Sequence, residues 1–345
     1  MDSSGVPPRE WADASDLAAL GKRPGPFLTV VLSMESESRH AARSNDVRWR
    51  ALRDDLEHQG APGPALAAVD AAVAEAHRRG RTLIVVADEG GAQHVGHWPD
   101  APFREIARWE PLPSLAPLVE RRQEAPPYVT VFAEADGAEV AVAGHLRPNA
   151  DEDEGGPAER GERWHGADGA DIAGRVTAMA RWSEARMVLL TGDGRSVDAI
   201  RAELPGDVAA LVAKFEGRPD PSDVERLVAE VAGSDTAALV RRLADDAGLR
   251  RTGVAPTVAA LAAGQAEVLL VHDDPADERI AWFGDDPLVL GVRREDVAGQ
   301  TTRPRTGRLV DALIRSALAG GAGVRVLPSP SLVDDGVAAL LRWNP

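Results

Sequence analysis

The sequence predicts an α/β protein built from three domains. Stretches with helical periodicity alternate along the whole chain with short runs rich in β-branched and large apolar residues. A length of 345 residues is enough for two or three domains that each bury a core. The stretch 120–127, rich in proline and charge, is typical of a linker, a new segment starts near Arg250, and no internal repeat is detectable. We therefore predict domains at 1–124, 125–250 and 251–345.

The first domain is predicted to combine buried strands with helices. The runs 27–32 and 82–87 are rich in β-branched and large apolar residues, which is typical of buried strands. Between them, the glycines and prolines at 60–64 separate two stretches with helical periodicity. The expected elements are a helix at 11–20, a strand at 27–32, helices at 39–58 and 65–79, a strand at 82–87 and a returning strand at 93–98.

The second domain opens with two strands around Asp136-Gly137, a dipeptide typical of hairpin turns. The segment 148–169 lacks apolar periodicity and is rich in carboxylates, so we expect a long loop there, either functional or disordered. The segment 208–215 fits either a helix or a strand. The other expected elements are strands at 128–133 and 139–143, a helix at 172–182, a strand at 186–191, a helix at 197–204, and long helices over 222–246 with Ser222 and Ser234 as caps.

The third domain continues the alternation of helices and strands. A helix at 254–264 leads into the apolar run 266–271, which is expected to be a strand. Glycines at 320–321 end a predicted helix, and a strand follows them. The expected elements are the helix at 254–264, the strand at 266–271, short strands at 281–283 and 288–290, a helix at 308–319, a strand at 323–327 and a closing segment at 336–343.

Composition excludes several classes of protein. The chain has no cysteine, which excludes disulfides, thiolate-bound zinc, iron–sulfur clusters and a cysteine nucleophile. It has no run of about 18 apolar residues and no basic stretch followed by an apolar one at its start, so we expect no membrane span, no signal peptide and a cytoplasmic location. The net charge of −16 argues against a general nucleic-acid coat. Divided by domain, the charges are −4, −10 and −2, so the acidity is concentrated in the middle domain.

Motifs for metal, phosphate or hydrolytic chemistry are weak in this sequence. His94 and His97 are spaced so that they point to opposite faces of a strand, and we expect neither a metal nor a cofactor. The turn 191–196 follows a strand and precedes a helix, and it fits either an anion site or an ordinary tight turn. The four carboxylates within 273–278 fit either a Mg²⁺ site or a solvated loop.

The predicted helix at 39–58 presents two distinct faces. One arc of the helical wheel carries its apolar residues, including Trp49, which we expect in the core. A neighbouring arc carries Arg39, Arg43, Arg50 and Arg53. Four guanidinium groups on one arc fit a surface that follows a phosphate backbone. The simpler interpretation is a solvated face whose arginines pair with Asp46, Asp54 and Glu57.

Several stretches, in the same order along the chain, resemble one family. They are 16–20, 24–30 with Glu35-Ser36, 48–53, 253–264, 266–271, 308–326 and 335–343. The stretch 253–271 is similar to the helix and strand that open the family's C-terminal domain, and 335–343 is similar to its closing segment. On these residues the chain resembles the bacterial branch of the archaeo-eukaryotic class-one peptide chain release factor and Pelota superfamily, the branch to which the ribosome hibernation factor Balon is related.

The resemblance implies an N-terminal domain directed at the decoding site, a middle domain directed at the peptidyl-transferase centre, and a C-terminal domain similar to the α-β-α sandwich of ribosomal L7Ae-type proteins. Release factors of this family hydrolyse peptidyl-tRNA through a Gly-Gly-Gln tripeptide on a middle-domain loop. This chain has no Gly-Gly-Gln, and its loop at 148–169 carries Gly155-Gly156-Pro157 instead. Proline supplies neither a backbone N–H nor a side-chain donor. We therefore expect no peptidyl-tRNA hydrolysis.

The leading hypothesis is a ribosome-associated factor that occupies the A-site region without hydrolysing peptidyl-tRNA, in ribosome hibernation, rescue or the stress response. Contacts with rRNA are expected from the helix arginines and from the loop 148–169. The predicted RNA-binding residues are Arg39, Arg43, Arg50, Arg53, Arg160, Arg163, Trp164 and His165. A translational GTPase or another protein is the further partner expected at the C-terminal domain, and no membrane partner is expected.

Two other functions stay open at this point. The charge of −10 in the middle domain favours an adaptor that has left the ribosome and binds a basic protein partner. An RNA or tRNA hydrolase that holds a metal ion at the carboxylates of 273–278 is the third hypothesis.

Overall fold

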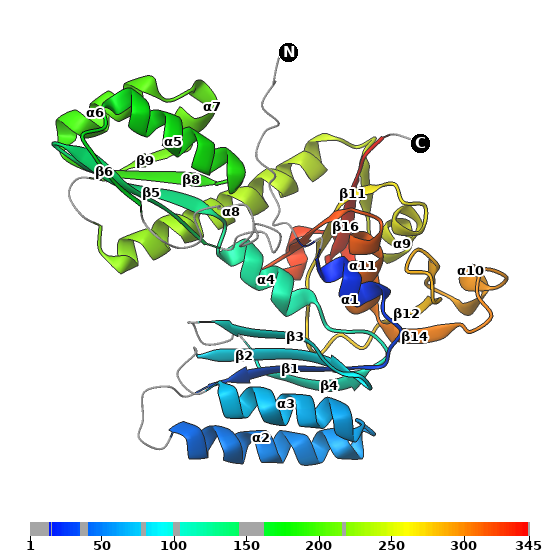
Figure 1. Ribbon diagram of the computed structural model, residues 1–345. Helices are drawn as coiled ribbons and strands as arrows, with labels where there is room; N and C mark the ends of the chain where they lie inside the picture. The colour runs from blue at the N-terminus through cyan, green and yellow to red at the C-terminus, as the bar shows by residue number, and fades with distance from the viewer. Residues whose placement is uncertain are drawn as a thin grey trace. The chain divides into compact units, whose positions relative to one another are not determined.

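The computed structural model describes residues 14, 16–34, 41–76, 81–98, 104–144, 162–215 and 219–343 (Figure 1). They form two compact units, one of residues 119–247 and the other of residues 14–118 together with 248–345. Helices and strands alternate in both, so the α/β fold class is confirmed. The division into three domains and the L7Ae-like character of the last one stay predictions. Within the described ranges, no helix is long and apolar enough to cross a membrane.

Residues 14–118 contain an antiparallel sheet with the strand order β3-β2-β1-β4. Helices α2 and α3 cover one of its faces (Figure 1) and share a core with strand residues such as Val30 and Val85. Strand β2 is buried at every residue, which explains why it forms a continuous apolar run in the sequence. The elements are α1 (Leu17–Lys22), β1 (Phe27–Ser33), α2 (Ala41–His58), α3 (Gly63–Glu75), β2 (Thr82–Asp88), β3 (Gly91–Trp98) and β4 (Ile106–Glu110). Helix α4 (Ala116–Glu124) begins in this segment and ends in residues 119–247.

Residues 248–345 contain a second sheet with the order β10-β16-β11-β15, in which β11 and β15 are parallel and the other pairs are antiparallel. Helices α9 and α11 pack against this sheet. A small antiparallel sheet has the order β13-β12-β14. The elements are β10 (Arg250–Thr252), α9 (Val254–Ala262), β11 (Ala266–Val271), β12 (Ile280–Phe283), β13 (Leu290–Gly291), α10 (Arg294–Val297), β14 (Arg305–Arg308), α11 (Leu309–Ala319), β15 (Gly323–Val326), the 3-10 turns Pro330–Leu332 and Asp334–Gly336, and β16 (Val337–Leu341).

Residues 119–247 fold around a mixed sheet with the order β7-β6-β5-β8-β9. Strands β5, β8 and β9 are parallel, and β6 and β7 continue the sheet antiparallel. Its core joins strand residues such as Val131 and Leu190 to helix residues such as Val176 and Ile200. The elements are β5 (Tyr128–Glu134), β6 (Gly137–Ala143), β7 (Glu162–His165), α5 (Gly169–Trp182), β8 (Met187–Gly192), α6 (Gly194–Glu203), α7 (Gly206–Ala209), β9 (Val212–Lys214) and α8 (Pro221–Asp245).

The structure corrects two predicted irregular segments. The predicted linker 120–127 lies largely within helix α4, which ends at Glu124, and Arg122 is buried there. The predicted loop 148–169 ends earlier than expected, because residues 162–165 form strand β7 and helix α5 begins at Gly169. Contacts with the rest of the fold determine the structure in both places: burial for helix α4 and strand pairing for strand β7. These contacts do not produce a regular spacing of apolar residues in the sequence, so the sequence pattern did not predict the two elements.

The structure also corrects the prediction for residues 222–246 and shows which elements form in the segments 208–215 and 336–343. Residues 221–245 form one helix, α8, capped by Asp220, whose side chain accepts from the N–H of Asp223 at 3.0 Å. Ser234, expected as a second cap, lies inside this helix. The ambiguous segment 208–215 contains the end of α7 followed by strand β9. The closing segment contains strand β16, which lies between β10 and β11.

Candidate nucleic-acid interface

Helix α2 is held by a buried apolar stripe. Trp49 and Leu56 are buried in the core beneath the sheet, as predicted for Trp49, and Leu52 packs against that core from its edge. The indole Nε1 of Trp49 donates to Oδ1 of Asp70 on helix α3 at 2.6 Å. Because the stripe and this hydrogen bond fix the rotation of the helix, they also fix which of its arginines face outward.

Arg53 lies beside this stripe and is bound by carboxylates. Its Nε donates to Oδ1 of Asp70 at 3.2 Å, and its Nη1 forms an ion pair with Glu57 one helical turn away. Glu57 is one of the partners that the solvated-face interpretation names, whereas Asp70 comes from the neighbouring helix. Arg53 therefore supports the contact between α2 and α3 and has little capacity left for an external anion.

Arg43 and Arg50 form the outward face of α2. Both are exposed, and within the described ranges neither has an ion pair or a hydrogen bond to a carboxylate. Val47 lies between them on the same face, and its side chain is 58% exposed. The spacing of three and four residues places the three side chains in one row along the helix. Arg39, the fourth predicted member, lies outside the described residues.

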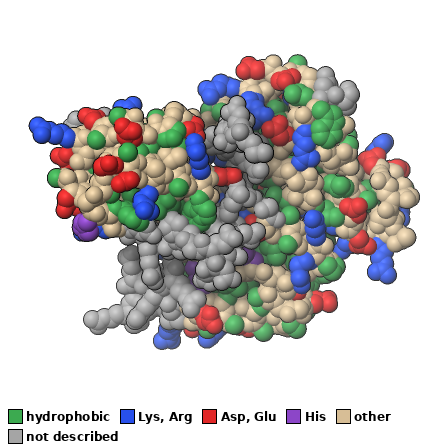
Figure 2. Space-filling view, turned by 45° about the horizontal axis from the view of Figure 1, so that its top comes forward, with side chains coloured by type: hydrophobic (Ala, Val, Ile, Leu, Met, Phe, Trp, Pro, Cys, Tyr) green, Lys and Arg blue, Asp and Glu red, His purple; other side chains and the backbone are tan. Residues whose placement is uncertain are grey.

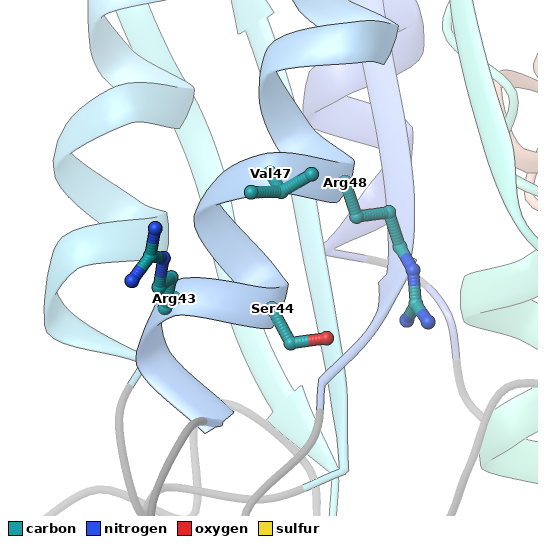
Figure 3. Close-up of a pocket in the computed structure, with 4 residues that line it drawn as sticks. All are labelled: Arg43, Ser44, Val47 and Arg48. Atoms are coloured by element: carbon teal, nitrogen blue, oxygen red, sulfur yellow. The ribbon is translucent and has the colours of Figure 1, made fainter.

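A hollow of about 470 Å³ lies at the N-terminal half of α2, lined by Arg43, Ser44, Val47 and Arg48. Arg43 and Arg48 extend from opposite sides of the helix, with Ser44 and Val47 between them (Figure 3). Arg48 is anchored, because its Nη1 donates to the carbonyl oxygen of Ser33 at 2.8 Å and lies 3.6 Å from Glu105. Sequence reasoning did not single out Arg48, since it lies off the arc of the other arginines.

The second predicted site, around strand β7, belongs to the other unit. Arg163 is exposed and donates to Glu139 of strand β6 at 3.1 Å, which raises the pKa of its guanidinium. Its neighbour His165 is also exposed. Arg160 lies outside the described residues, as do Gly155, Gly156 and Pro157.

Trp164 lies between these two residues but points the other way, because side chains alternate along a strand. Its ring packs against the core of the unit, and the guanidinium of Arg175 lies 3.3 Å from the ring centroid. A base can stack on this ring only after Arg175 moves away. The indole N–H is buried and has no hydrogen-bond partner in the part of the chain that the structure describes.

The carboxylates of 273–278 do not gather into a metal site. Asp273 is buried and accepts from both Arg104 and Arg308, while Asp277 accepts from Arg279 at 2.7 Å. Across the described ranges, no group of three or more His, Asp or Glu side chains is placed to hold a metal ion. This arrangement gives the hydrolase hypothesis no support, because arginines already bind the carboxylates that the metal would need.

The turn 191–196 offers no free anion site. Asp193 caps helix α6 and accepts from both the N–H and the hydroxyl of Ser196 at 3.0 Å. These hydrogen bonds lower the pKa of Asp193, so a carboxylate occupies the position that a bound anion would take.

Acidic and basic side chains are interspersed over the face shown in Figure 2, and no continuous patch of one sign covers its described residues.

The middle of the chain is similar to a known protein family. Residues 159–251 match the model of bacterial archaeo-eukaryotic release factor family 2. This match supports the resemblance to the release factor and Pelota superfamily that the sequence motifs indicate. The matched residues include strand β7 and helix α8 and exclude helix α2. No curated protein has significant sequence similarity to the chain.

The solved structures that match the chain include archaeal and yeast proteins. The ribosome-bound archaeal Pelota has 14% identity, with 100% of this chain and 99% of that one covered, at a TM-score of 0.37. Archaeoglobus fulgidus Pelota has 18% identity, with coverage of 76% and 80%, at a TM-score of 0.31. Saccharomyces cerevisiae Dom34 has 10% identity, with coverage of 66% of each chain, at a TM-score of 0.36. These scores are low, so the similarity to the family rests on residues 159–251 and on the sequence motifs.

Proposed function

We propose that this chain is a cytoplasmic, ribosome-associated protein of release-factor type that does not hydrolyse peptidyl-tRNA, and that it acts in ribosome hibernation, rescue or the stress response. The observation that carries the proposal is the match of residues 159–251 to the bacterial release factor family. The ordered series of motifs at both ends of the chain extends the same resemblance beyond the matched residues.

The outward face of α2 supports a contact with rRNA in the A-site region. Arg43 and Arg50 are exposed and have no carboxylate partner within the described ranges, so binding a phosphate breaks no ion pair among the described residues. Guanidinium groups bind phosphate oxygens through paired N–H donors. The exposed Val47 between them adds an apolar contact for a sugar or a base edge.

Co-sedimentation with 70S ribosomes tests the ribosomal contact. We expect the purified protein to migrate with ribosomes at low salt and to dissociate as salt rises, because phosphate contacts release counterions. The double variant Arg43→Glu/Arg50→Glu should bind at least about tenfold more weakly. Its matched control is Arg195→Glu/Arg201→Glu, which makes the same charge change at two exposed arginines of helix α6. Wild-type protein that stays at the top of the gradient at low salt would refute the proposal.

The absence of hydrolytic activity has its own test. Gly-Gly-Gln is missing from the whole sequence, and Pro157 follows the only glycine pair of the loop 148–169. To hydrolyse peptidyl-tRNA, this loop would have to bring its backbone close to the ester bond and supply a side-chain amide that positions the water. We expect ribosomes that carry formylmethionyl-tRNA to release no more formylmethionine with this protein than without it. Release above that background would show that another group replaces the glutamine.

An adaptor that binds a basic protein away from the ribosome is the second candidate, favoured by the net charge of −10 over residues 125–250. The variant Arg43→Glu/Arg50→Glu separates the two functions, because it should weaken ribosome binding at least about tenfold and leave an adaptor contact through the middle domain unchanged. A complex from cell lysate that contains no ribosomal protein and survives this substitution would favour the adaptor.

A translational GTPase or another protein is the partner we propose for residues 251–345. Hydrogen exchange of the full chain, with and without the GTP-bound GTPase, tests this contact. Slower exchange confined to residues 251–345 is expected, and no change in exchange there would exclude that GTPase as the partner.

A further inference from the structure

Residues 104–114 and residues 273–315 meet in a buried cluster of charged side chains, within the unit formed by residues 14–118 and 248–345. At its centre is Asp273, which is 5% exposed. Arg104 forms an ion pair with its Oδ2 and donates to its carbonyl oxygen at 2.7 Å. Arg308 donates to Oδ1 of the same carboxylate at 2.9 Å. One carboxylate thus connects an arginine of the first segment to an arginine of the last.

Asp311 extends this chain of charges into helix α11. It is 2% exposed, and its Oδ2 accepts from the hydroxyl of Ser114 at 3.3 Å and lies 3.6 Å from Nη1 of Arg308. Ser114 in turn donates its N–H to the hydroxyl of Thr29 on strand β1 at 3.1 Å. Within the described ranges, Oδ1 of Asp311 has no hydrogen-bond partner. A buried carboxylate needs several donors to hold its negative charge, and this carboxyl group has few.

The charged groups around Asp311 come from both segments. Arg308 and Asp273 face it from the last segment, and Arg108 faces it from strand β4. Arg104 and Asp277 act on it indirectly, through their interactions with Asp273 and Arg308. The positive charges of Arg308 and Arg108 therefore favour the ionised form of Asp311, whereas the negative charge of Asp273 and the loss of hydration favour its neutral form.

Two further arginines tie the same segments together through backbone oxygens. Arg315 of helix α11 donates from Nε to the carbonyl oxygen of Gly21 at 2.7 Å, and its other nitrogens donate to the carbonyl oxygens of Gly284 and Asp285. Arg108 donates to the carbonyl oxygen of Pro275 at 3.2 Å. Polar groups, several of them buried, thus contribute to the contact between the segments, and their partners lie far away in the sequence.

We propose that residues 14–118 and 248–345 move as one rigid body, held together by the connected side chains of Arg104, Asp273, Arg308 and Asp311. We call these four side chains the lock, and the lock loosens when Asp311 loses its proton. A neutral Asp311 keeps its hydrogen bond with Ser114 and needs no further donors. An ionised Asp311 requires water or additional donors, and water reaches it only if the two segments separate locally. This inference does not depend on ribosome binding.

The burial of Asp311 raises the pKa of its carboxyl group to about 7, because the loss of hydration outweighs the attraction of Arg308. The neutral form therefore dominates below that pH and the ionised form above it. A transition in the lock is expected close to neutral pH.

Distance measurements between spin labels test the lock in the full chain. The protein has no cysteine, so Asp55→Cys on helix α2 and Glu295→Cys on helix α10, both exposed positions, give one defined label pair. The distance distribution should be narrow at about pH 6 and at least twice as wide at about pH 8.5. In the Asp311→Asn background it should stay narrow at both values, since the amide does not ionise. In the Asp207→Asn background, which removes an exposed carboxylate of the other unit, it should widen as in the wild type.

A second variant keeps the test decisive if Asp311→Asn does not fold. Arg104→Met removes one arginine of the lock, and it should widen the distribution at both pH values. A wild-type distribution of the same width at both pH values would refute the proposal. An Asp311→Asn distribution that widens with pH as the wild type does would show that another group controls the lock.

Discussion

The indole Nε1 of Trp49 donates to Oδ1 of Asp70 at 2.6 Å, and the guanidinium of Arg53 reaches the same oxygen at 3.2 Å. One carboxylate on α3 therefore holds two side chains of α2. The orientation of the proposed RNA-binding face depends on this contact, because it fixes the rotation of the helix.

Asp70→Ala should lower the free energy of unfolding by about 1–3 kcal/mol, since the buried N–H of Trp49 loses its acceptor. Urea unfolding followed by tryptophan fluorescence measures this loss. Asp54→Ala, which removes an exposed carboxylate of helix α2, is the control and should cost less than about 0.5 kcal/mol. Equal losses for the two variants would show that the hydrogen bond contributes nothing.

The arginines of α2 should differ in their effect on the salt dependence of ribosome binding. Arg43→Ala and Arg50→Ala should each reduce the slope of log K against log salt by roughly 0.7–0.9, the value for one lost phosphate contact. Arg53→Ala should leave the slope unchanged, because its guanidinium is bound to Asp70 and Glu57. Binding titrations over a range of salt concentrations check this. A slope reduced by Arg53→Ala would return that arginine to the RNA-binding face.

Gly192 permits a close approach of strands β8 and β5. It has a φ of +114°, and a Cβ atom there would lie 2.0 Å from the carbonyl oxygen of Ala133. Gly192→Ala should therefore cost about 3 kcal/mol or more, or prevent folding of this unit. Gly194→Ala is the matched control, because a Cβ atom at this helical position meets nothing within 4 Å and alanine favours the helix. Thermal unfolding distinguishes the two variants, and a stable Gly192→Ala protein would contradict the prediction.

Arg186 and Asp235 form a largely buried ion pair that ties the start of strand β8 to helix α8, with side chains that are 17% and 9% exposed. Asp235→Ala leaves a buried guanidinium without its partner and should cost roughly 3–5 kcal/mol. Removal of the exposed pair Arg181–Asp207 by Asp207→Ala should cost at most about 1 kcal/mol. Denaturant unfolding of the full chain provides both values, and similar costs would mean that water reaches the Arg186–Asp235 pair.

Stability should fall as pH rises from about 4 to about 7 because of Asp311. Its pKa of about 7 in the folded chain exceeds that of an unfolded aspartate, so the folded state binds the proton more tightly. Unfolding then releases a proton in this window, and the wild type should lose up to about 1.4 kcal/mol per pH unit relative to Asp311→Asn. Unfolding free energies of both proteins between these pH values give the difference. A difference that does not change with pH would place the pKa of Asp311 near its ordinary value.

Much of the local structure could be predicted from the sequence. The β-branched runs at 27–32 and 266–271 form buried strands, because a strand covered on both faces needs apolar side chains at successive positions. The wheel of α2 correctly placed Trp49 in the core. Strand β7 and helix α4 were missed, because each mixes polar and apolar residues without a regular period. Arg163 and His165 of β7 are exposed around the half-buried Trp164, and α4 buries Arg122 together with its apolar residues, so only their packing partners fix these elements.

The candidate site could be predicted only in part. The common arc of Arg43, Arg50 and Arg53 follows from helical geometry, and the sequence alone shows it. That Arg53 is bound in an ion pair depends on Asp70, a residue of another helix that no local pattern connects to Arg53. The anchoring of Arg48 by Ser33 is likewise a contact between separate elements.

The sequence by itself determined the alternation of helices and strands, which face of α2 is apolar, the absence of Gly-Gly-Gln and the acidity of residues 125–250, because these depend on local periodicity or on residue identity. Only the tertiary structure decided that residues 14–118 and 248–345 share one unit and that Asp273 binds two arginines. The physical reason is that a local pattern encodes which side chains are buried, whereas the partner of a buried charge comes from wherever the fold brings a complementary group within hydrogen-bond distance.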